Sequence, residues 1–221
     1  MPVVHPTPPV AATSVSLLRT MPRLLGGLAV CSAGVAMMIR AELGLGPWDV
    51  LHQGLAVATG ISVGLATILV GAGVLLLWFP LRQRPGVGTV INVLMIGTML
   101  DVFLGMTSTP GDAWARWLLM LAGPLVFGLG VAVYIGAGIG TGPRDGVMTG
   151  LEQRGIPIAL ARTAIELSAL LAGWLLGGTV GVGTLYFAFS VGPVMHVLMP
   201  RLRAPWFPAG AAPRVLGASG H

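Results

Sequence analysis

Long apolar runs separated by short polar breaks make up most of the chain. A helix rises about 1.5 Å per residue, so about 20 mostly apolar residues cross the hydrocarbon core of a bilayer. Six runs fit this pattern: residues 24–39 with an extension to 43, 61–81, 86–106, 117–139, 156–178 and 179–200. The pattern predicts an all-α membrane protein with six transmembrane helices.

The two ends of the chain differ from this apolar middle. Residues 1–18 and 204–221 contain several prolines and no long apolar run, which is typical of loose tails. The first tail has no basic segment directly followed by an apolar core, so we do not expect a signal peptide. The prediction is a single integral membrane domain over residues 1–221 with a loose tail at each end.

A short motif occurs twice, each time after a long apolar run. The copies lie 96 residues apart and share glycine, proline and aspartate at matching places: Gly44, Gly46, Pro47 and Asp49 in the first, and Gly140, Gly142, Pro143 and Asp145 in the second. Residues 86–89 recur as residues 181–184, at an offset of 95. Residues 24–106 and 118–200 are therefore expected to be two copies of one unit.

Each copy contains three predicted spans. An odd number of spans makes the second copy enter the membrane in the opposite orientation, so we expect two inverted-topology three-helix repeats. Secondary transporters often use this plan, with the binding site at the repeat interface near the bilayer midplane. Residues 47–60 and 143–155, after the motifs, are too short to span and are expected to form interfacial or re-entrant helices. If they did span, the repeats would instead be parallel.

Few charges are present, and their placement indicates an orientation. The chain is 55% hydrophobic and 9% charged, whereas soluble domains carry about 25% charged residues, so the lipid bilayer is the expected partner. All 12 basic residues are arginines scattered between the apolar runs, which argues against nucleic acid as a partner. With a cytoplasmic N-terminus, nine arginines lie inside, Arg40 and Arg116 lie outside, and Arg162 lies within the fifth span. The positive-inside rule favours this topology, with both termini cytoplasmic.

The motif aspartates have two interpretations. Proline suits the first position of a helix, and Asp49 or Asp145 two residues later would meet free backbone N–H groups in the first turn. In this reading the aspartates only cap helices. Alternatively, the glycines leave unwound backbone and a helix N-terminus directed into a cavity, where the aspartates bind a cation or a proton.

Other polar residues inside the apolar runs are candidate binding residues. Arg162 and Glu166 lie four residues apart on one helix face, where each charge would cost about 2.5–3.5 kcal/mol at the bilayer centre unless paired or facing water. Arg162 alternatively extends to the cytoplasmic interface. Glu166, which lies deeper, is the stronger candidate for a functional carboxylate.

Three further candidates lie in the third and sixth spans. Asp101 and His196 occupy matching places in the two repeats. The histidine could relay protons or form an interfacial hydrogen bond. Asn92 could bind a substrate or bond to a neighbouring helix. No cluster of metal ligands, cofactor fingerprint or nucleophile–base pair is visible, so we expect no metal, no cofactor and no enzymatic activity.

Residues 39–51, with residues 60–64 and 142–146, resemble the bacterial YczE/YyaS/YitT membrane-protein family. The resemblance covers roughly residues 20–200. It implies a multi-pass protein of the bacterial inner membrane. It transfers no established binding or catalytic residues, so the candidates above rest on the sequence pattern alone.

Two functions remain open from the sequence. The first is a small-molecule or ion transporter or permease, with a substrate bound between the repeats near Asp49, Asp145 and Glu166; such a protein could act as a homodimer. The second is an accessory or regulatory membrane protein that transports nothing and docks a partner through its arginine-rich loops.

Overall fold

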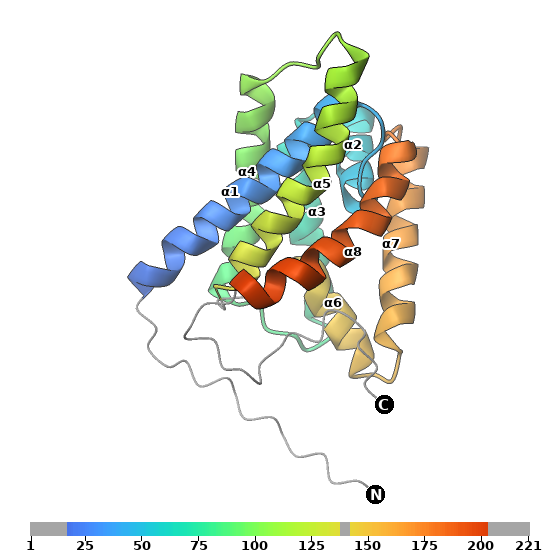
Figure 1. Ribbon diagram of the computed structural model, residues 1–221. Coiled ribbons are helices and arrows are strands. Elements are labelled where there is room, and N and C mark those ends of the chain that lie inside the picture. The colour runs from blue at the N-terminus through green and yellow to red at the C-terminus, as the bar shows by residue number, and fades with distance from the viewer. Residues whose placement is uncertain (1–16, 138–141, 203–221) are drawn as a thin grey trace, which may run out of the picture.

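The computed structural model describes residues 17–137 and 142–202, which form eight α-helices and no strand (Figure 1). This confirms the all-α fold class. The helices are α1 (Leu17–Ala41), α2 (Pro47–Thr59), α3 (Val63–Trp78), α4 (Val87–Met106), α5 (Ala113–Ile135), α6 (Pro143–Glu152), α7 (Ile158–Leu175) and α8 (Val182–Leu202). Six of them correspond to the six predicted spans, and α2 and α6 are the two predicted short helices.

Several predicted spans have different limits in the structure; α5, for example, begins and ends four residues earlier than predicted. Helix α3 is only 16 residues long and reaches membrane-spanning length and hydropathy only together with α2, from which it is bent by 115°. Helix α1 begins at Leu17, inside the predicted tail. In this first part of α1 the Arg23 guanidinium donates a hydrogen bond to the carbonyl of Leu202 at the end of α8.

The short helices pack across the repeat boundary. Helix α2 lies against α7, and α6 lies against α3. Both begin at a proline, which suits the first helical position because its missing N–H would have no partner there. Helix α2 ends at Gly60, which adopts a left-handed φ of 76°. Each repeat therefore inserts its short helix against the second long helix of the other repeat.

Helices α1 and α5 form the central pair and run antiparallel (Figure 1). Their backbones touch at glycines: a Cβ on Gly34 would lie 2.5 Å from the Phe127 nitrogen, and one on Gly130 would lie 2.4 Å from the Cys31 nitrogen. The two contacts are equivalent, because Gly34 and Gly130 lie 96 residues apart, as do Cys31 and Phe127, and this is the offset between the motifs. Inverted repeats require such an antiparallel pair. The opposite orientation of the whole repeats in a bilayer stays a prediction.

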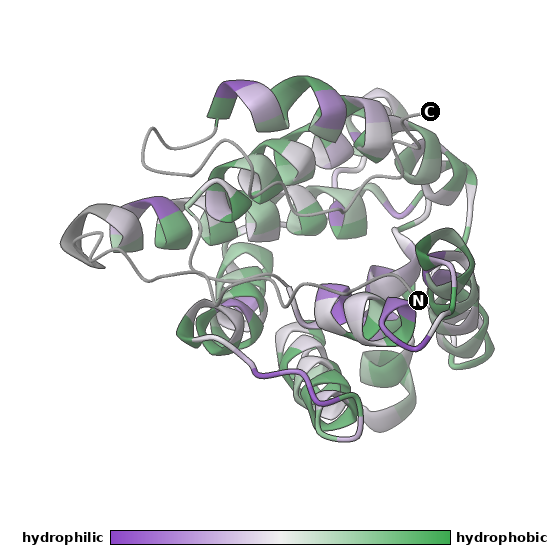
Figure 2. Ribbon diagram, turned by 90° about the horizontal axis from the view of Figure 1, so that it is seen from below, coloured by the Kyte–Doolittle hydropathy of each residue, from purple (hydrophilic) through white to green (hydrophobic). Residues whose placement is uncertain are grey.

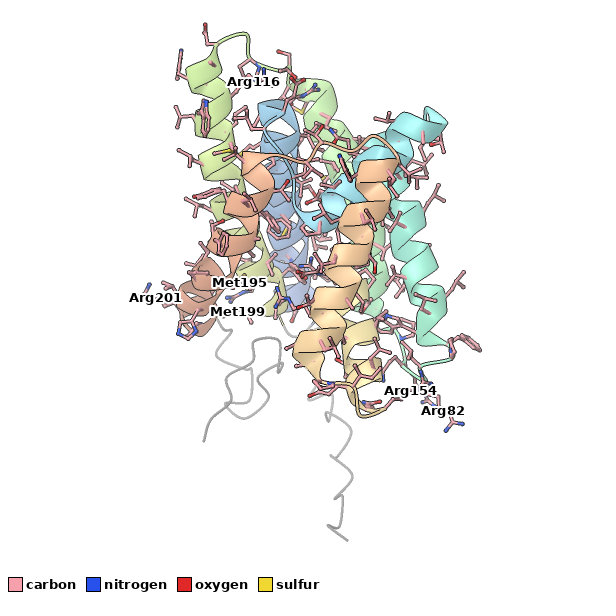
Figure 3. The ribbon with its side chains drawn as sticks, turned by 90° about the vertical axis from the view of Figure 1, so that its right-hand side faces the viewer. Arg82, Arg116, Arg154, Met195, Met199 and Arg201 are labelled. Carbon is pink, nitrogen blue, oxygen red and sulfur yellow. The ribbon has the colours of Figure 1, made fainter. Side chains whose placement is uncertain are left out.

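The outer surface of the described helices is apolar, as a lipid-facing surface must be. Large apolar side chains are exposed on several helices, among them Leu76, Met106, Leu175 and Phe189, and Figure 2 shows the helices largely in the colours of apolar residues. We call the side where α1 begins and α8 ends the terminal face. Arg82, Arg154 and Arg201 lie on it, whereas Arg116 lies at the opposite end, the distal face (Figure 3).

Candidate functional site

A cavity lies in the middle of the helix bundle, and all eight helices contribute to its wall. It offers about 110 Å³ to the centres of water-sized molecules. Much of the lining is apolar, including Val70, Val74, Phe127 and Phe187. The polar and charged groups that line this central cavity include Trp48, Asp49, His52, Asn92, Arg144 and Glu166.

Both motifs reach this cavity. Residues 46–49 and 142–144 line it, so the N-termini of α2 and α6 meet there from the two repeats. A helix N-terminus carries free N–H groups and partial positive charge, which favours negatively charged groups nearby. Gly44 makes the turn before α2 with a left-handed φ of 118°. Its counterpart Gly140 lies outside the described residues.

The two motif aspartates are held differently. Asp145 accepts a hydrogen bond of 3.0 Å from the Gly142 N–H and lies 4.0 Å from the Arg144 side chain, so it caps its own helix. Asp49 makes no such bond to Gly46. Its carboxylate lies 3.6 Å from the Nδ1 atom of His52 and faces the central cavity. Capping therefore accounts for Asp145, whereas Asp49 forms no capping hydrogen bond.

Two buried nitrogen atoms of residues in the cavity wall, Trp48 Nε1 and His52 Nδ1, have no hydrogen-bond partner within the described part of the chain. Asn92, which is only 4% exposed, contacts the side chain of Tyr134 in the same wall. An unsatisfied buried polar group costs about 1–3 kcal/mol, so the Trp48 and His52 nitrogens favour an arrangement in which they gain a partner.

The ion pair predicted in the fifth span is present. Arg162 Nε lies 3.1 Å from Glu166 Oε1, one helical turn along α7. Glu166 faces the central cavity, and Arg162 faces a second cavity of about 170 Å³. This terminal cavity lies between α5, α6, α7 and α8 on the side of the terminal face, as the positions of Met195 and Met199 show (Figure 3). The two cavities share part of their walls, including Tyr134 and Arg144.

Asp101 and His196 are not brought together. The Asp101 carboxylate accepts hydrogen bonds from the Gly64 N–H at 2.8 Å and the Ser62 hydroxyl at 2.5 Å, so it ties α4 to the start of α3. It lines neither cavity. His196, at the matching place in α8, lines the terminal cavity. Asn92 faces the central cavity and contacts the side chain of Tyr134 in α5.

Among the cavity residues that were not candidates from the sequence, three carry polar or charged groups important for the site. Trp48 and Arg144 directly follow the motif prolines, and His52 lies one turn into α2. A signal for the first two was available, because they occupy the same place in the two motif copies. The signal is weak because that place holds unlike residues, an aromatic side chain and a guanidinium.

The apolar exterior and the spanning helices define a multi-pass α-helical membrane protein. The chain belongs to a family of unknown function, DUF6198, whose model matches residues 18–200. This confirms the resemblance seen in the sequence. No solved structure matches the chain.

Relatives in two bacteria are similar along most of their length. A Haemophilus influenzae protein described as uncharacterized is 37% identical over 192 residues, which are 86% of this chain and 88% of the relative. The uncharacterized membrane protein YczE of Bacillus subtilis is 32% identical over 79% of this chain and 83% of its own length. YyaS from the same organism is 26% identical over 79% of this chain and 89% of its own length.

Proposed function

We propose that the protein is a small transporter or permease whose substrate binds in the central cavity. One observation carries the proposal: the N-termini of α2 and α6, one from each predicted repeat, meet in a single cavity whose wall holds unpartnered polar nitrogens. Broken helices that end at a central site between repeats are typical of secondary transporters. A purely structural role leaves those buried nitrogens unexplained.

A difference between matched helix pairs supports alternating access. Helices α3 and α4 touch closely, because a Cβ on Gly97 would lie 2.4 Å from the Gly64 carbonyl oxygen. Gly192 is the counterpart of Gly97 in α8, and a Cβ there would meet nothing within 4 Å. Gly192 instead lines the terminal cavity. The bundle is thus closed between α3 and α4 and open between α7 and α8.

Transport then exchanges the two arrangements. Closing α7 against α8 at Gly192 while opening α3 from α4 at Gly97 would move access from the terminal face to the distal face. Asp101 acts as a latch in this scheme, because its bonds to Ser62 and Gly64 must break when α3 and α4 separate.

We place the protein in the bacterial inner membrane with the terminal face in the cytoplasm. The arginines support this orientation: the loop between α3 and α4 holds Arg82 and Arg84, the loop after α6 holds Arg154, and Arg201 is in the last turn of α8. The distal end has Arg40 and Arg116, and Arg116 is paired with Glu42 at 2.8 Å.

Uptake into proteoliposomes tests the proposal. Wild-type protein is compared across a panel of labelled small metabolites with Asp49→Asn, Asp145→Asn and, as a control at an exposed site, Asp112→Asn. We expect flux of at least one compound, loss of that flux in Asp49→Asn and normal flux in Asp112→Asn. A stoichiometric protein partner with no flux of any compound would instead support an accessory role.

A further inference from the structure

The polar groups of the central cavity fall into two sets of opposite character. We infer that the cavity binds a compact zwitterion, a small molecule that carries one ammonium and one carboxylate group. This inference rests on the proposed function and names the substrate class for that site.

The first set calls for a carboxylate. The Trp48 indole N–H has no partner among the described residues, and it can only donate a hydrogen bond. Arg144 adds a positive charge to the same wall, with Asp145 4.0 Å from it. The N-terminus of α2 adds partial positive charge, whereas that of α6 is capped by Asp145. A ligand carboxylate would satisfy the Trp48 donor and face the positive charge.

The second set calls for an ammonium group. Among the described residues none donates a hydrogen bond to the Asp49 carboxylate, whose side chain is 14% exposed. His52 lies 3.6 Å away, beyond hydrogen-bond distance, and only its protonated form would balance the charge. Glu166 supplies a second carboxylate, but Arg162 already pairs with it. A ligand ammonium beside Asp49 would balance that aspartate.

The size of the cavity restricts the ligand. A cavity of about 110 Å³ favours a compact ligand. The apolar wall, which includes Val70, Val74 and Val93, suits a short hydrocarbon group on the ligand.

Single-charge ligands fit less well. A simple carboxylate would leave Asp49 without a counter-charge in the interior of a membrane protein, which is unfavourable. A simple amine would leave the Trp48 donor unpaired. A site built for a polar group rejects analogues that lack it, because its own buried polar atoms then lose their partner.

Matched ligands test the inference with the purified full-length protein in detergent. The panel contains compact zwitterions, each with its deaminated and decarboxylated counterparts; L-valine, 3-methylbutanoate and 2-methylpropylamine form one such set. Binding is measured by calorimetry and by the midpoint of thermal unfolding. We expect at least one zwitterion to raise the midpoint by about 5 °C at one hundred times its Kd. Its single-charge counterparts should bind at least tenfold more weakly.

Variants locate the binding in the cavity. Trp48→Phe removes one N–H and keeps the aromatic ring, so zwitterion affinity should fall about tenfold, with exposed Trp117→Phe as the control. Asp49→Asn should abolish the preference over the deaminated counterpart, whereas Asp112→Asn should not.

The outcomes separate the two proposals. Equal or tighter binding of a single-charge counterpart, lost on Trp48→Phe, would overturn the zwitterion and leave a transport site of another class. Absence of binding by every zwitterion in the panel would overturn the inference as well. If proteoliposomes also show no flux of any metabolite, the transport proposal fails too.

Discussion

One motif places an aspartate at the start of two helices, and the two carboxylates do different things. Asp145 bonds to the Gly142 N–H, whereas Asp49 bonds to no backbone group of its own helix start. The shared motif residues therefore give one capping carboxylate and one that makes no capping bond. The residues that differ between the copies account for part of this: Arg144 lies beside Asp145, where the first copy has Trp48, and Asp49 lies near His52 and the cavity.

This contrast predicts opposite effects on stability. Asp145→Ala should lower the free energy of unfolding by about 1 kcal/mol, because a helix start loses its cap. Asp49→Asn should leave stability unchanged or raise it, because the change removes a charge without a hydrogen-bond partner. Thermal unfolding of the detergent-solubilised protein, without ligand, measures both. A loss in Asp49→Asn as large as that in Asp145→Ala would show that Asp49 is structural.

The candidate site was only partly predictable from the residues. The structure places three candidates on one cavity: Asp49, chosen from the repeated motif, and Glu166 and Asn92, chosen as polar groups within apolar segments. Asp101 was chosen for the same reason, yet it ties α4 to α3. Polarity inside a membrane helix indicates that a side chain needs a partner. It does not say whether the partner is a neighbouring helix or a ligand, because this depends on which way the helix faces.

At the level of the helices, the pair α3–α4 and its counterpart α7–α8 differ in how closely they pack. Gly97 of α4 contacts the backbone of Gly64 in α3, whereas its counterpart Gly192 in α8 has no atom of the described residues within 4 Å of its Cβ position. The sequence repeat predicts that the pairs are related. It cannot predict that one is closed and the other open, because both arrangements use the same residues and differ only in how the helices are placed.

Alanine at the two glycines should therefore behave differently. Gly97→Ala forces a methyl group into a backbone contact and should cost about 1–3 kcal/mol of stability. Gly192→Ala meets nothing in this arrangement and should be neutral or stabilising by up to about 1 kcal/mol, since alanine favours a helix. Thermal midpoints of the two variants give the comparison. An equal decrease of the thermal midpoint in both variants would mean that α7 and α8 are also in contact at Gly192.

A larger side chain at Gly192 tests the proposed motion rather than the fold. Gly192→Leu fills space next to α7 in the arrangement described here, so the protein should fold and bind its ligand. It should also prevent α8 from closing on α7, and uptake into proteoliposomes should fall at least tenfold. Gly105→Leu, at an exposed glycine of α4 with nothing within 4 Å, is the matched control. Normal uptake in Gly192→Leu would rule out closure at this position.

For the whole molecule, the hydrophobic pattern was sufficient to predict an all-α fold with eight helices, two of them short. Segment length and turn residues carry that information. The depth of α2 and α6 was not predictable, because an apolar 13-residue helix can lie at a surface or enter the bundle. The position of these two helices in the bundle follows from their packing, because α2 lies against α7 and α6 lies against α3.

Topology and access can be tested together with single cysteines. Cys31 is fully buried and is replaced by alanine, and cysteines are then placed at Arg84, Gly111 or Gly192. Positions 84 and 111 are exposed in loops at the two ends of the bundle, and position 192 lines the terminal cavity. A membrane-impermeant thiol reagent should label position 111 in intact cells, and positions 84 and 192 in inverted vesicles.

The two halves of that experiment separate orientation from access. Labelling of 84 in intact cells and of 111 in inverted vesicles would reverse the proposed orientation without affecting the fold. Labelling of 192 from the same side as 111 would contradict access from the terminal face, whichever way the protein is inserted. Saturating ligand should slow labelling at 192 if binding favours closure of α7 on α8, because the thiol then becomes buried between the two helices.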